Sequence, residues 1–269
     1  MAKQRVDVIL VERGYFESRS KAAAAVLAGD VQLDEGGRRI EKPGQTFEPD
    51  VALRVAVRER YVSRGGIKLE NALAAFPKIK IEGRRALDAG ASTGGFTDCL
   101  LQRGAEHVIA VDVAYGELHW SIREDARVTV IERRNIRELT AAELEYAAEL
   151  IVADLSFIAL EKVLPSILAV ASKRFDMLAL VKPQFEVGRE RIGKGGVVRD
   201  RATRIDAIAG AAVAAQAAGF SVVGACSSGL PGPAGNREAF LWLAEQTRPG
   251  AEDLRELAES VEPEGADAR

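Results

Sequence analysis

The sequence is poor in the residues that build metal and redox sites. It has two cysteines and two histidines in 269 residues. Cys99 and Cys226 lack the spacing of a metal site or a redox pair, and we expect both to be small core residues. His107 and His119 have no partner motif, which favours surface or strand-edge positions over catalysis. We therefore expect no metal site.

Long apolar runs are also absent. No stretch of the sequence approaches the roughly 18 consecutive apolar residues that span a bilayer. The alanine-rich segment 205–220 is interrupted by Asp206 and Gln216, so it is interpreted as a packed helix. The first residues include Lys3, Arg5 and Asp7 and show no apolar core of a secretory signal. We expect a cytoplasmic protein without a membrane partner.

A net charge of −3 argues at first against a nucleic-acid partner. Residues 251–269, however, hold seven acids and only two arginines, so the other 250 residues carry +2. Basic residues cluster at 58–68, 133–137 and 189–199. Such clusters are usually solvated surface, and they support phosphate binding only where they lie beside a site.

The most informative segment is Asp88–Thr97, which reads DAGASTGGFT and follows a short apolar run. A strand that turns through glycines into a helix lets backbone N–H groups approach a ligand without a Cβ in the way. The spacing is not the G-x-G-x-x-G of dinucleotide enzymes, so a pyrophosphate is not indicated. Binders of S-adenosylmethionine typically have this strand, loop and helix. They also have an acid after the next strand, which here is Asp112.

The first 57 residues have the pattern of a small independent domain. Asp7–Arg13 has helical spacing, and Ser18 is a suitable N-cap for a second helix that runs through Ala28 to Gly29. Short strands are expected at Val31–Leu33 and Val51–Val57. Basic residues in the first turn of the second helix oppose the helix dipole, which indicates an anionic partner.

This domain resembles the small RNA-binding domain shared by the S-four type of ribosomal protein, pseudouridine synthases and tyrosyl-tRNA synthetases. The matching stretch runs through Gly29–Asp34 to Lys42-Pro43-Gly44. In that family the second helix and the following loop lie against the RNA backbone. The resemblance therefore assigns RNA contacts to Arg19, Lys21 and Lys42, and Arg64 joins them from the basic cluster at 58–68. The alternative is a helical hairpin that binds protein.

After a linker at 58–63, strands and helices alternate through residues 64–250. Helix Arg64–Phe76 comes first. Strands are expected at Ala86–Asp88, Val108–Asp112, Val128–Ile131, Leu150–Ala153, Met177–Val181, Ser221–Ala225 and Ala239–Leu243. This α/β pattern predicts a Rossmann-like, parallel sheet with helices on both faces. Residues 251–269 are expected to be an acidic tail, part helix and part disordered.

Four chemically active residues follow strands or flank them. Asp154 and Lys182 directly follow two predicted strands, Glu238 precedes the last strand, and Lys68 belongs to a Ser-Arg-Gly-Gly-Ile-Lys-Leu segment. Burial and a neighbouring cation both favour the neutral amine of a lysine, which can take a proton from a hydroxyl. The alternative is two ordinary salt bridges at a sheet edge. Four matching segments favour an active site.

These segments resemble those of the FtsJ-like ribose 2′-O-methyltransferases. Together with the S-four-like domain, residues 3–247 resemble the TlyA family of ribosomal RNA (cytidine-2′-O)-methyltransferases, whose members are sometimes labelled haemolysins. The motifs that carry the resemblance are SRGGIKL, LDAGASTGGFTDCLL, VADLSFI, LVKPQFEVG and LPGPAGNREAFLWL. In the linker Arg58–Val62, this chain departs from the family's Arg-Ala-Trp-Val, and Tyr61 can replace the aromatic residue.

The resemblance implies S-adenosyl-L-methionine as cofactor, ribosomal RNA and ribosomal subunits as partners, and a monomer. It implies a catalytic set of Lys68, Asp154, Lys182 and Glu238. It also implies cofactor contacts from Asp88, Gly90, Ser92, Gly94, Phe96, Asp112, Asn135 and Asp154. Four residues, Asp88, Asp112, Asp154 and Lys182, lie at the carboxyl ends of predicted strands and are expected to meet in one crevice.

Three other functions remain as alternatives. A cytolysin would need a secretion signal or an amphipathic insertion segment, and the sequence shows neither. A non-catalytic RNA-binding protein for ribosome assembly would not need all four catalytic residues. A nicotinamide dehydrogenase would need a different glycine spacing.

Overall fold

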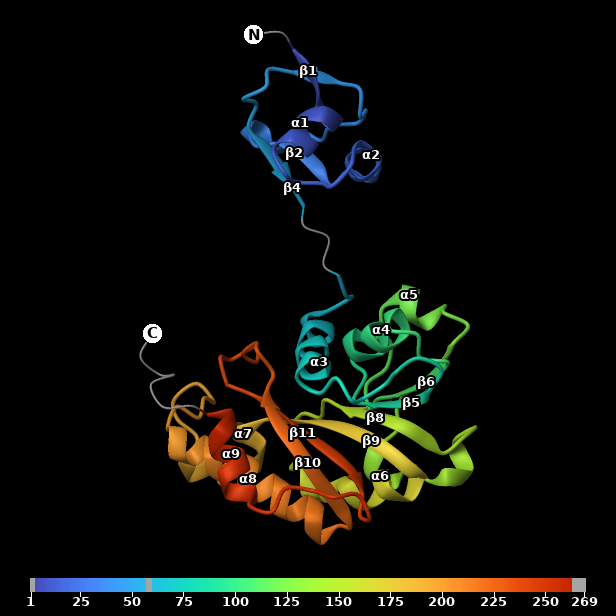
Figure 1. Cartoon of the computed structure of the whole chain (residues 1–269), viewed down its shortest axis with the longest axis vertical. Coiled ribbons are helices and arrows are strands. Elements are labelled where there is room, and N and C mark those ends of the chain that lie inside the picture. The colour runs from blue at the N-terminus through green and yellow to red at the C-terminus, as the bar shows by residue number, and fades with distance from the viewer. Residues whose placement is uncertain (1–2, 57–59, 263–269) are drawn as a thin grey trace. The chain divides into compact units, whose positions relative to one another are not determined.

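The computed structural model describes residues 3–56 and 60–262 and divides the chain into two compact units. Unit 1 is Met1–Glu59 and unit 2 is Arg60–Arg269. The predicted domain boundary at residue 57, part of the predicted linker and the last seven residues lie outside the described residues. Each unit is described by itself, and both appear in Figure 1.

Unit 1 packs two helices against short antiparallel strand pairs. Its elements are β1 (Gln4–Arg5), α1 (Val6–Glu12), α2 (Arg19–Ala28), β2 (Val31–Leu33), η1 (Glu35–Gly37), β3 (Thr46–Phe47) and β4 (Leu53–Val55). Strand β1 pairs with β3, and β2 pairs with β4. The Ser18 hydroxyl accepts a hydrogen bond from Lys21 N at the start of α2, and Gly29 ends the helix with φ 85°. Side chains such as Val6, Leu10 and Val26 form its core.

Unit 2 is built around a seven-stranded sheet. Its strands are β5 (Arg85–Ala89), β6 (His107–Val111), β7 (Val128–Ile131), β8 (Ala148–Ala153), β9 (Ala171–Val181), β10 (Phe220–Ser227) and β11 (Ala239–Glu245). They lie in the order β10-β11-β9-β8-β5-β6-β7. All seven predicted strands are present, and the α/β fold class is confirmed. Most residues of these strands are apolar because helices cover both faces of the sheet.

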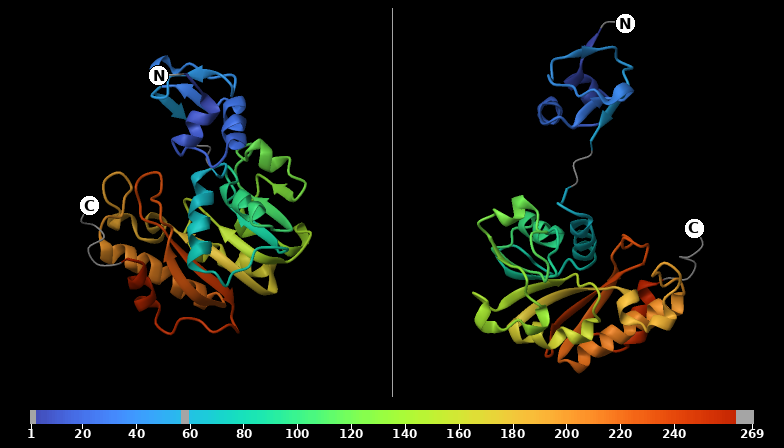
Figure 2. Two further views of the ribbon diagram at one scale, coloured as in Figure 1. Left: turned by 45° about the horizontal axis from the view of Figure 1, so that its top comes forward. Right: turned by 180° about the vertical axis from the view of Figure 1, so that it is seen from behind.

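The helices of unit 2 form two layers. They are α3 (Arg64–Ala75), α4 (Gly95–Gln102), α5 (Trp120–Arg123), α6 (Leu164–Val170), α7 (Pro183–Glu186), α8 (Arg201–Ala217) and α9 (Leu254–Val261), with short 3₁₀ turns η2 (Ile136–Glu138), η3 (Ala141–Glu143), η4 (Leu160–Lys162) and η5 (Arg189–Arg191). Helices α3 and α4 cover one face, and α6, α8 and α9 cover the other (Figures 1 and 2). Two hydrophobic clusters, one on each face, hold the layers together.

One part of the predicted topology is wrong, because the sheet is not wholly parallel. Strand β11 runs antiparallel to both β9 and β10. Residues 228–238, which connect β10 to β11, contain no helix, so the chain makes a hairpin instead of crossing over the sheet. The pairing of β11 with β9 brings the residue before β11 beside the residue after β9.

The predicted acidic tail contains a helix, as expected, but this helix packs against unit 2. Helix α9 occupies residues 254–261, where Leu254 and Ala258 are buried against the cluster that includes α8. Glu262 forms a buried ion pair with Arg204 at 2.9 Å. Apolar residues at helical spacing let this acidic segment pack, so unit 2 extends well past residue 250.

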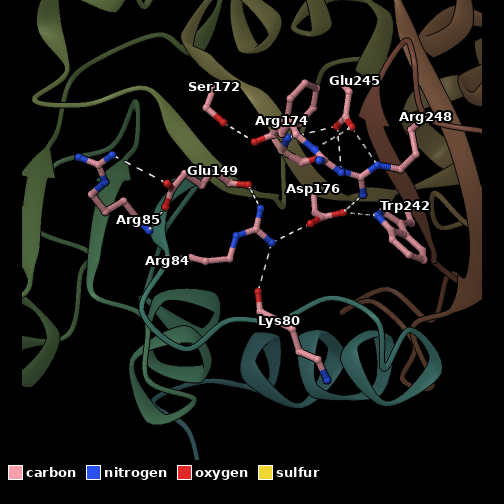
Figure 3. Close-up of polar contacts among 11 residues, drawn as sticks. Lys80, Arg84, Arg85, Glu149, Ser172, Arg174, Asp176, Trp242, Glu245 and Arg248 are labelled. Carbon is pink, nitrogen blue, oxygen red and sulfur yellow. Dashed lines mark hydrogen bonds and ion pairs between the residues drawn. The ribbon is translucent and has the colours of Figure 1, made fainter.

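A charged network closes the end of the sheet where β8 begins. The carboxylate of Asp176 accepts hydrogen bonds from Arg84 Nη1 at 2.7 Å, from Trp242 Nε1 at 2.9 Å and from Arg248 (Figure 3). Glu245 also holds Arg248, at 2.8 Å. Because these residues come from β9, β11 and the segments beside β5 and β11, the network fastens the hairpin strands to the parallel strands.

Candidate active site

The glycine loop connects β5 to α4 beside the ends of two other strands. Gly90 adopts φ 86°, and its N–H donates to Val111 O at 2.8 Å. A Cβ on Gly90 would lie 2.6 Å from the backbone oxygen of Asp154. The end of β8 therefore requires glycine at this position, and the loop backbone lies open to one side of the sheet edge.

A cavity of about 430 Å³ lies at this edge, in the size range of small-molecule sites. Its lining comes from the carboxyl ends of β5, β6, β7 and β8. Five of the predicted cofactor contacts line it: Gly90, Ser92, Asp112, Asn135 and Asp154.

Asp112 organises the floor of this cavity. Its carboxylate accepts hydrogen bonds from Ser92 N at 2.7 Å and from Ala114 N at 2.8 Å. A carboxylate has about four acceptor sites, so two remain for hydroxyl groups of a ligand. Ser92 has φ 46°, a strained conformation that Asp112 helps to hold. The residues present fit a ligand with ribose hydroxyls.

Three predicted cofactor residues do not line the cavity. Asp88 is completely buried, and its carboxylate accepts bonds from Thr97 N at 3.0 Å and Thr97 Oγ1 at 2.7 Å. Gly94 lies against Leu118, and Phe96 packs in the core with its ring 5.8 Å from that of Phe240.

Asp88 does not line the cavity because of the direction of its side chain. Asp88 precedes the last residue of β5 and points under the loop toward α4, where burial raises the pKa of its carboxyl to about 7. Asp88 therefore supports the glycine loop through Thr97 and does not line the cavity.

Lys68 and Glu238 form a buried ion pair. Lys68 Nζ lies 2.6 Å from Glu238 Oε2, and the two side chains are 8% and 1% exposed. Helix α3 carries Lys68 to the loop before β11, and Asn71 of the same helix donates to Ser228 O at 3.0 Å. The other carboxylate oxygen of Glu238 is buried without a hydrogen-bond partner in the described part of the chain.

Lys182 and Asp154 form a second pair. Lys182 Nζ lies 2.6 Å from Asp154 Oδ1 and donates to Ser156 Oγ at 2.8 Å. The side chain of Lys182 is 12% exposed and that of Asp154 is 24% exposed. Because Asp154 also lines the cavity, the amine of Lys182 lies beside it.

The strand register brings the two pairs to one edge of the sheet. Ala239 pairs with Val181 in antiparallel strands. Glu238, just before Ala239, and Lys182, just after Val181, therefore lie at neighbouring strand ends. Asp154 follows β8, the neighbour of β9 on the other side. The arrangement brings two amines and two carboxylates to neighbouring strand ends, and one of the four, Asp154, lines the ligand cavity. Such a set is suited to moving a proton.

The predicted RNA-contact residues are exposed. Arg19 is 59% exposed and lies 3.3 Å from Asp7, while Lys21 is 63% exposed and pairs with Glu17. Lys42 is also exposed. These three belong to unit 1. Arg64 belongs to unit 2, where it donates to Pro231 O at 2.9 Å.

A second cavity, of about 590 Å³, was not predicted. It shares Arg137, Phe157 and Ile158 with the first cavity. Phe157 is 91% exposed with φ 65°, and its ring lies 5.2 Å from that of Phe185. Phe157 belongs to the VADLSFI motif and Phe185 to the LVKPQFEVG motif. A phenylalanine three residues after Asp154 and three after Lys182 was the signal from which this cavity could have been predicted.

Tyr61 anchors the first residues of unit 2. It is 2% exposed, and a Cβ on Gly66 would lie 2.3 Å from its ring. The next residue, Val62, donates its N–H to Asp98 Oδ2 at 2.8 Å. The tyrosine therefore occupies a buried position between α3 and α4, the helix that follows the glycine loop.

Across residues 3–56 and 60–262, no helix is long and apolar enough to cross a membrane. The same residues contain no group of three or more His, Cys, Asp or Glu side chains that could hold a metal ion.

Comparisons with known proteins agree on one family. Residues 61–245 match the FtsJ-like methyltransferase family. The chain is 50% identical over 247 residues to the 16S/23S rRNA (cytidine-2′-O)-methyltransferase TlyA of Mycobacterium tuberculosis, covering 91% of each chain. It is 37% identical to Hemolysin A of Brachyspira hyodysenteriae, covering 87% of this chain and 97% of that protein. A solved structure, "Putative hemolysin from Streptococcus thermophilus", is similar with a TM-score of 0.72 and 38% identity, covering 97% of this chain and 96% of that one.

Proposed function

Because the chain belongs to the FtsJ-like methyltransferase family, we propose that it methylates the ribose 2′-hydroxyl of a cytidine in ribosomal RNA. The names of the similar TlyA proteins support this substrate. The observation that carries the proposal is the pair of lysine–carboxylate contacts at the sheet edge, one of which borders the ligand cavity. An RNA substrate of this kind also implies action in the cytoplasm.

S-adenosyl-L-methionine is the methyl donor in this proposal. When bound, it supplies an electrophilic methyl group on a sulfonium centre. Asp112 would accept hydrogen bonds from its ribose hydroxyls, and the backbone at Gly90 and Ser92 would approach it closely. Asn135 and Asp154 would complete the contacts.

Lys182 is the proposed proton acceptor. Its amine would take the proton of the 2′-hydroxyl as the oxygen bonds to the methyl carbon and the sulfur–carbon bond breaks. Asp154 and Ser156 orient the amine through the contacts at 2.6 and 2.8 Å. Glu238 holds the second amine, that of Lys68, at the neighbouring strand end. The reaction mainly requires that the 2′-oxygen be aligned with the methyl carbon and that water be excluded, and a lysine held in a fixed position contributes to both.

The second cavity is the proposed site of the target nucleotide. It joins the cofactor cavity through Arg137 and Phe157, and Lys162 and Arg189 add positive charge to its lining. An exposed aromatic ring offers a surface for a base, and basic side chains offer contacts for phosphates. Unit 1 would supply additional affinity through Arg19, Lys21 and Lys42.

The alternatives are less well supported. A haemolysin function rests on the names of similar proteins alone. A purely structural RNA-binding protein gives no reason to bury Lys68 and Glu238 as a pair, since buried ion pairs contribute little net stability.

The experiment that tests the proposal is a methylation assay. Purified protein, labelled S-adenosylmethionine and ribosomal subunits from cells lacking the protein are combined, and the RNA is digested to nucleosides. We expect label in 2′-O-methylcytidine, and none with Lys182→Ala. Label on a base, or no label in ribosomal RNA, would contradict the proposal.

A further inference from the structure

The segment that follows β6 presents apolar side chains to solvent. Val113 is 66% exposed, and Tyr115 and Trp120 are both 67% exposed. These are three of the five large apolar side chains that are exposed in the described part of unit 2. Single exposed apolar residues are ordinary, but a group within eight residues marks an interaction surface.

The backbone of this segment is held firmly. Gly116 N donates to Glu132 Oε1 at 2.9 Å, and Arg133 N donates to Ala114 O at 3.2 Å. Ala114 N is also bonded to Asp112. The backbone on both sides of Tyr115 is therefore ordered, and Trp120 is the first residue of helix α5. An ordered backbone lowers the entropy that a partner must overcome on binding.

Arg133 lies over one of these rings. Its guanidinium carbon is 4.2 Å from the centre of the Tyr115 ring, and its backbone adopts φ 56°. Such strain in a residue other than glycine persists only where surrounding contacts impose it, and it concentrates at functional sites. The hydrogen bond between Arg133 N and Ala114 O is one such contact.

The charge of Arg133 is not neutralised by an ion pair within the described residues. The adjacent acid, Glu132, is engaged by Arg123 and by the N–H of Gly116. Arg133 is exposed as well. Glu132 still attracts Arg133 electrostatically. A stacked, exposed guanidinium that forms no ion pair within the described residues can contact a phosphate or extend a stack of rings.

The surface is continuous with the site already described. Val113 and Ala114 line the proposed cofactor cavity, together with Arg134 and Arg137 of the segment that carries Arg133. We name Val113, Tyr115, Trp120 and Arg133 the aromatic shelf. Asp154, whose carboxylate holds Lys182, lines the same cavity as Val113, so one edge of the shelf and the Lys182 pair border one cavity.

We propose that the aromatic shelf binds an unpaired base of the RNA next to the methylated nucleotide, by stacking on Tyr115 and Trp120, while Arg133 contacts the backbone. This inference rests on the proposed function. Stacking fits a base because every base has a flat face, and an exposed guanidinium outside the ion pairs of the described residues fits a phosphate. A protein partner gives no particular reason for Arg133 to lack an ion pair within the described residues, whereas a phosphate does.

Substitutions at the shelf test this directly. Tyr115→Ala and Trp120→Ala should each raise the KM for ribosomal RNA about tenfold, with kcat and binding of S-adenosylhomocysteine unchanged. Tyr115→Phe keeps the ring and should stay near wild type, whereas Tyr115→Leu should behave like the alanine variant. Val213→Ala, at an exposed apolar position on α8, is the control. A wild-type KM for both alanine variants would overturn the proposal.

A second experiment identifies the base. Abasic nucleotides are placed in turn at unpaired positions beside the target in a synthetic RNA. At one position the abasic nucleotide should raise the KM of the wild-type protein about tenfold. The same RNA should not raise the KM of Tyr115→Ala any further. Equal losses by both proteins at every position would overturn stacking.

Three outcomes separate this inference from others. If the alanine variants lose affinity for intact subunits but bind protein-free ribosomal RNA normally, the shelf contacts a ribosomal protein and the proposal is wrong. If the wild-type protein methylates no ribosomal RNA, the proposed function itself has failed. Methylation by wild type with no effect of the shelf variants rejects the shelf alone.

Discussion

The side chain on which the proposed reaction depends most is Lys182. Lys182→Ala should abolish methyl transfer while binding of S-adenosylhomocysteine and RNA stays near wild type, because the amine acts on the reacting hydroxyl. Lys182→Arg should be equally inactive, since a guanidinium remains charged and cannot accept a proton. Single-turnover methylation measures both.

Lys173→Ala is the matched control, because Lys173 is exposed near the start of the same strand, β9. If Lys182→Arg transfers methyl groups at nearly the wild-type rate, the lysine only positions the substrate, and the proton-acceptor role is wrong.

Asp112 should determine cofactor affinity. Asp112→Ala removes the proposed acceptor for the ribose hydroxyls and also frees the N–H groups of Ser92 and Ala114. We expect calorimetry with S-adenosylhomocysteine to show at least a tenfold loss, about 1.4 kcal/mol. Glu124→Ala, an exposed acid in the same region, should bind like wild type. Wild-type affinity for Asp112→Ala would mean that the cavity has been misassigned.

Glu186 should make stability depend on pH. Burial raises the pKa of its carboxyl to about 7, although Leu160 N donates to it at 2.9 Å. Because the folded protein holds this proton more tightly than the unfolded chain, the contribution to stability is complete below pH 4.5. It is lost as the pH rises through 7.

Glu186→Gln should therefore resemble wild type at pH 5 and be more stable by about 2 kcal/mol at pH 8. Urea unfolding at both values measures the difference. Asp88 adds a dependence of the same sign, which cancels in this comparison. A glutamine variant with the same stability difference at both pH values would show that Glu186 does not titrate in this range.

At the scale of elements, the network around Asp176 should hold the hairpin of β10 and β11 to the parallel strands (Figure 3). Asp176→Ala leaves the indole N–H of Trp242 without its acceptor. It also removes the carboxylate from Arg84 and Arg248, which keep only their other acceptors. We expect a loss of about 3 kcal/mol in the free energy of unfolding, measured in urea. Arg174, which is 86% exposed and 3.9 Å from Glu245, is the control, and Arg174→Ala should change stability little. Equal effects of the two variants would exclude a special role for the network.

At the scale of the whole molecule, unit 1 should supply RNA affinity and not cofactor affinity. Combining Arg19→Glu with Lys21→Glu should weaken binding to ribosomal RNA and reduce the slope of log affinity against log salt by about 1 to 2, because fewer counterions are released. Binding of S-adenosylhomocysteine should not change. Lys173→Glu with Arg174→Glu is a control of equal charge. Unchanged methylation of intact subunits by the Arg19 and Lys21 variant would reject this role.

The elements were predictable where their signals are local. Ser18 and Gly29 mark the ends of α2, and continuous apolar runs mark the strands of the sheet. The antiparallel direction of β11 was not predicted, because the partner of a strand is decided by non-local pairing. The packing of α9 was not predicted, because the helix is rich in acidic residues and buries only two side chains, Leu254 and Ala258.

The sequence by itself determined the fold class, the family and the segments that meet at the sheet edge, because these depend on residue type and spacing. Only the tertiary structure decided which side chains face the cavity. Asp88, Gly94 and Phe96 belong to the glycine motif, yet strand and helix geometry turns them into the core. The tertiary structure also decided that Lys68 pairs with Glu238 and Lys182 with Asp154. The first pair joins residues 170 positions apart, so it depends on where α3 packs.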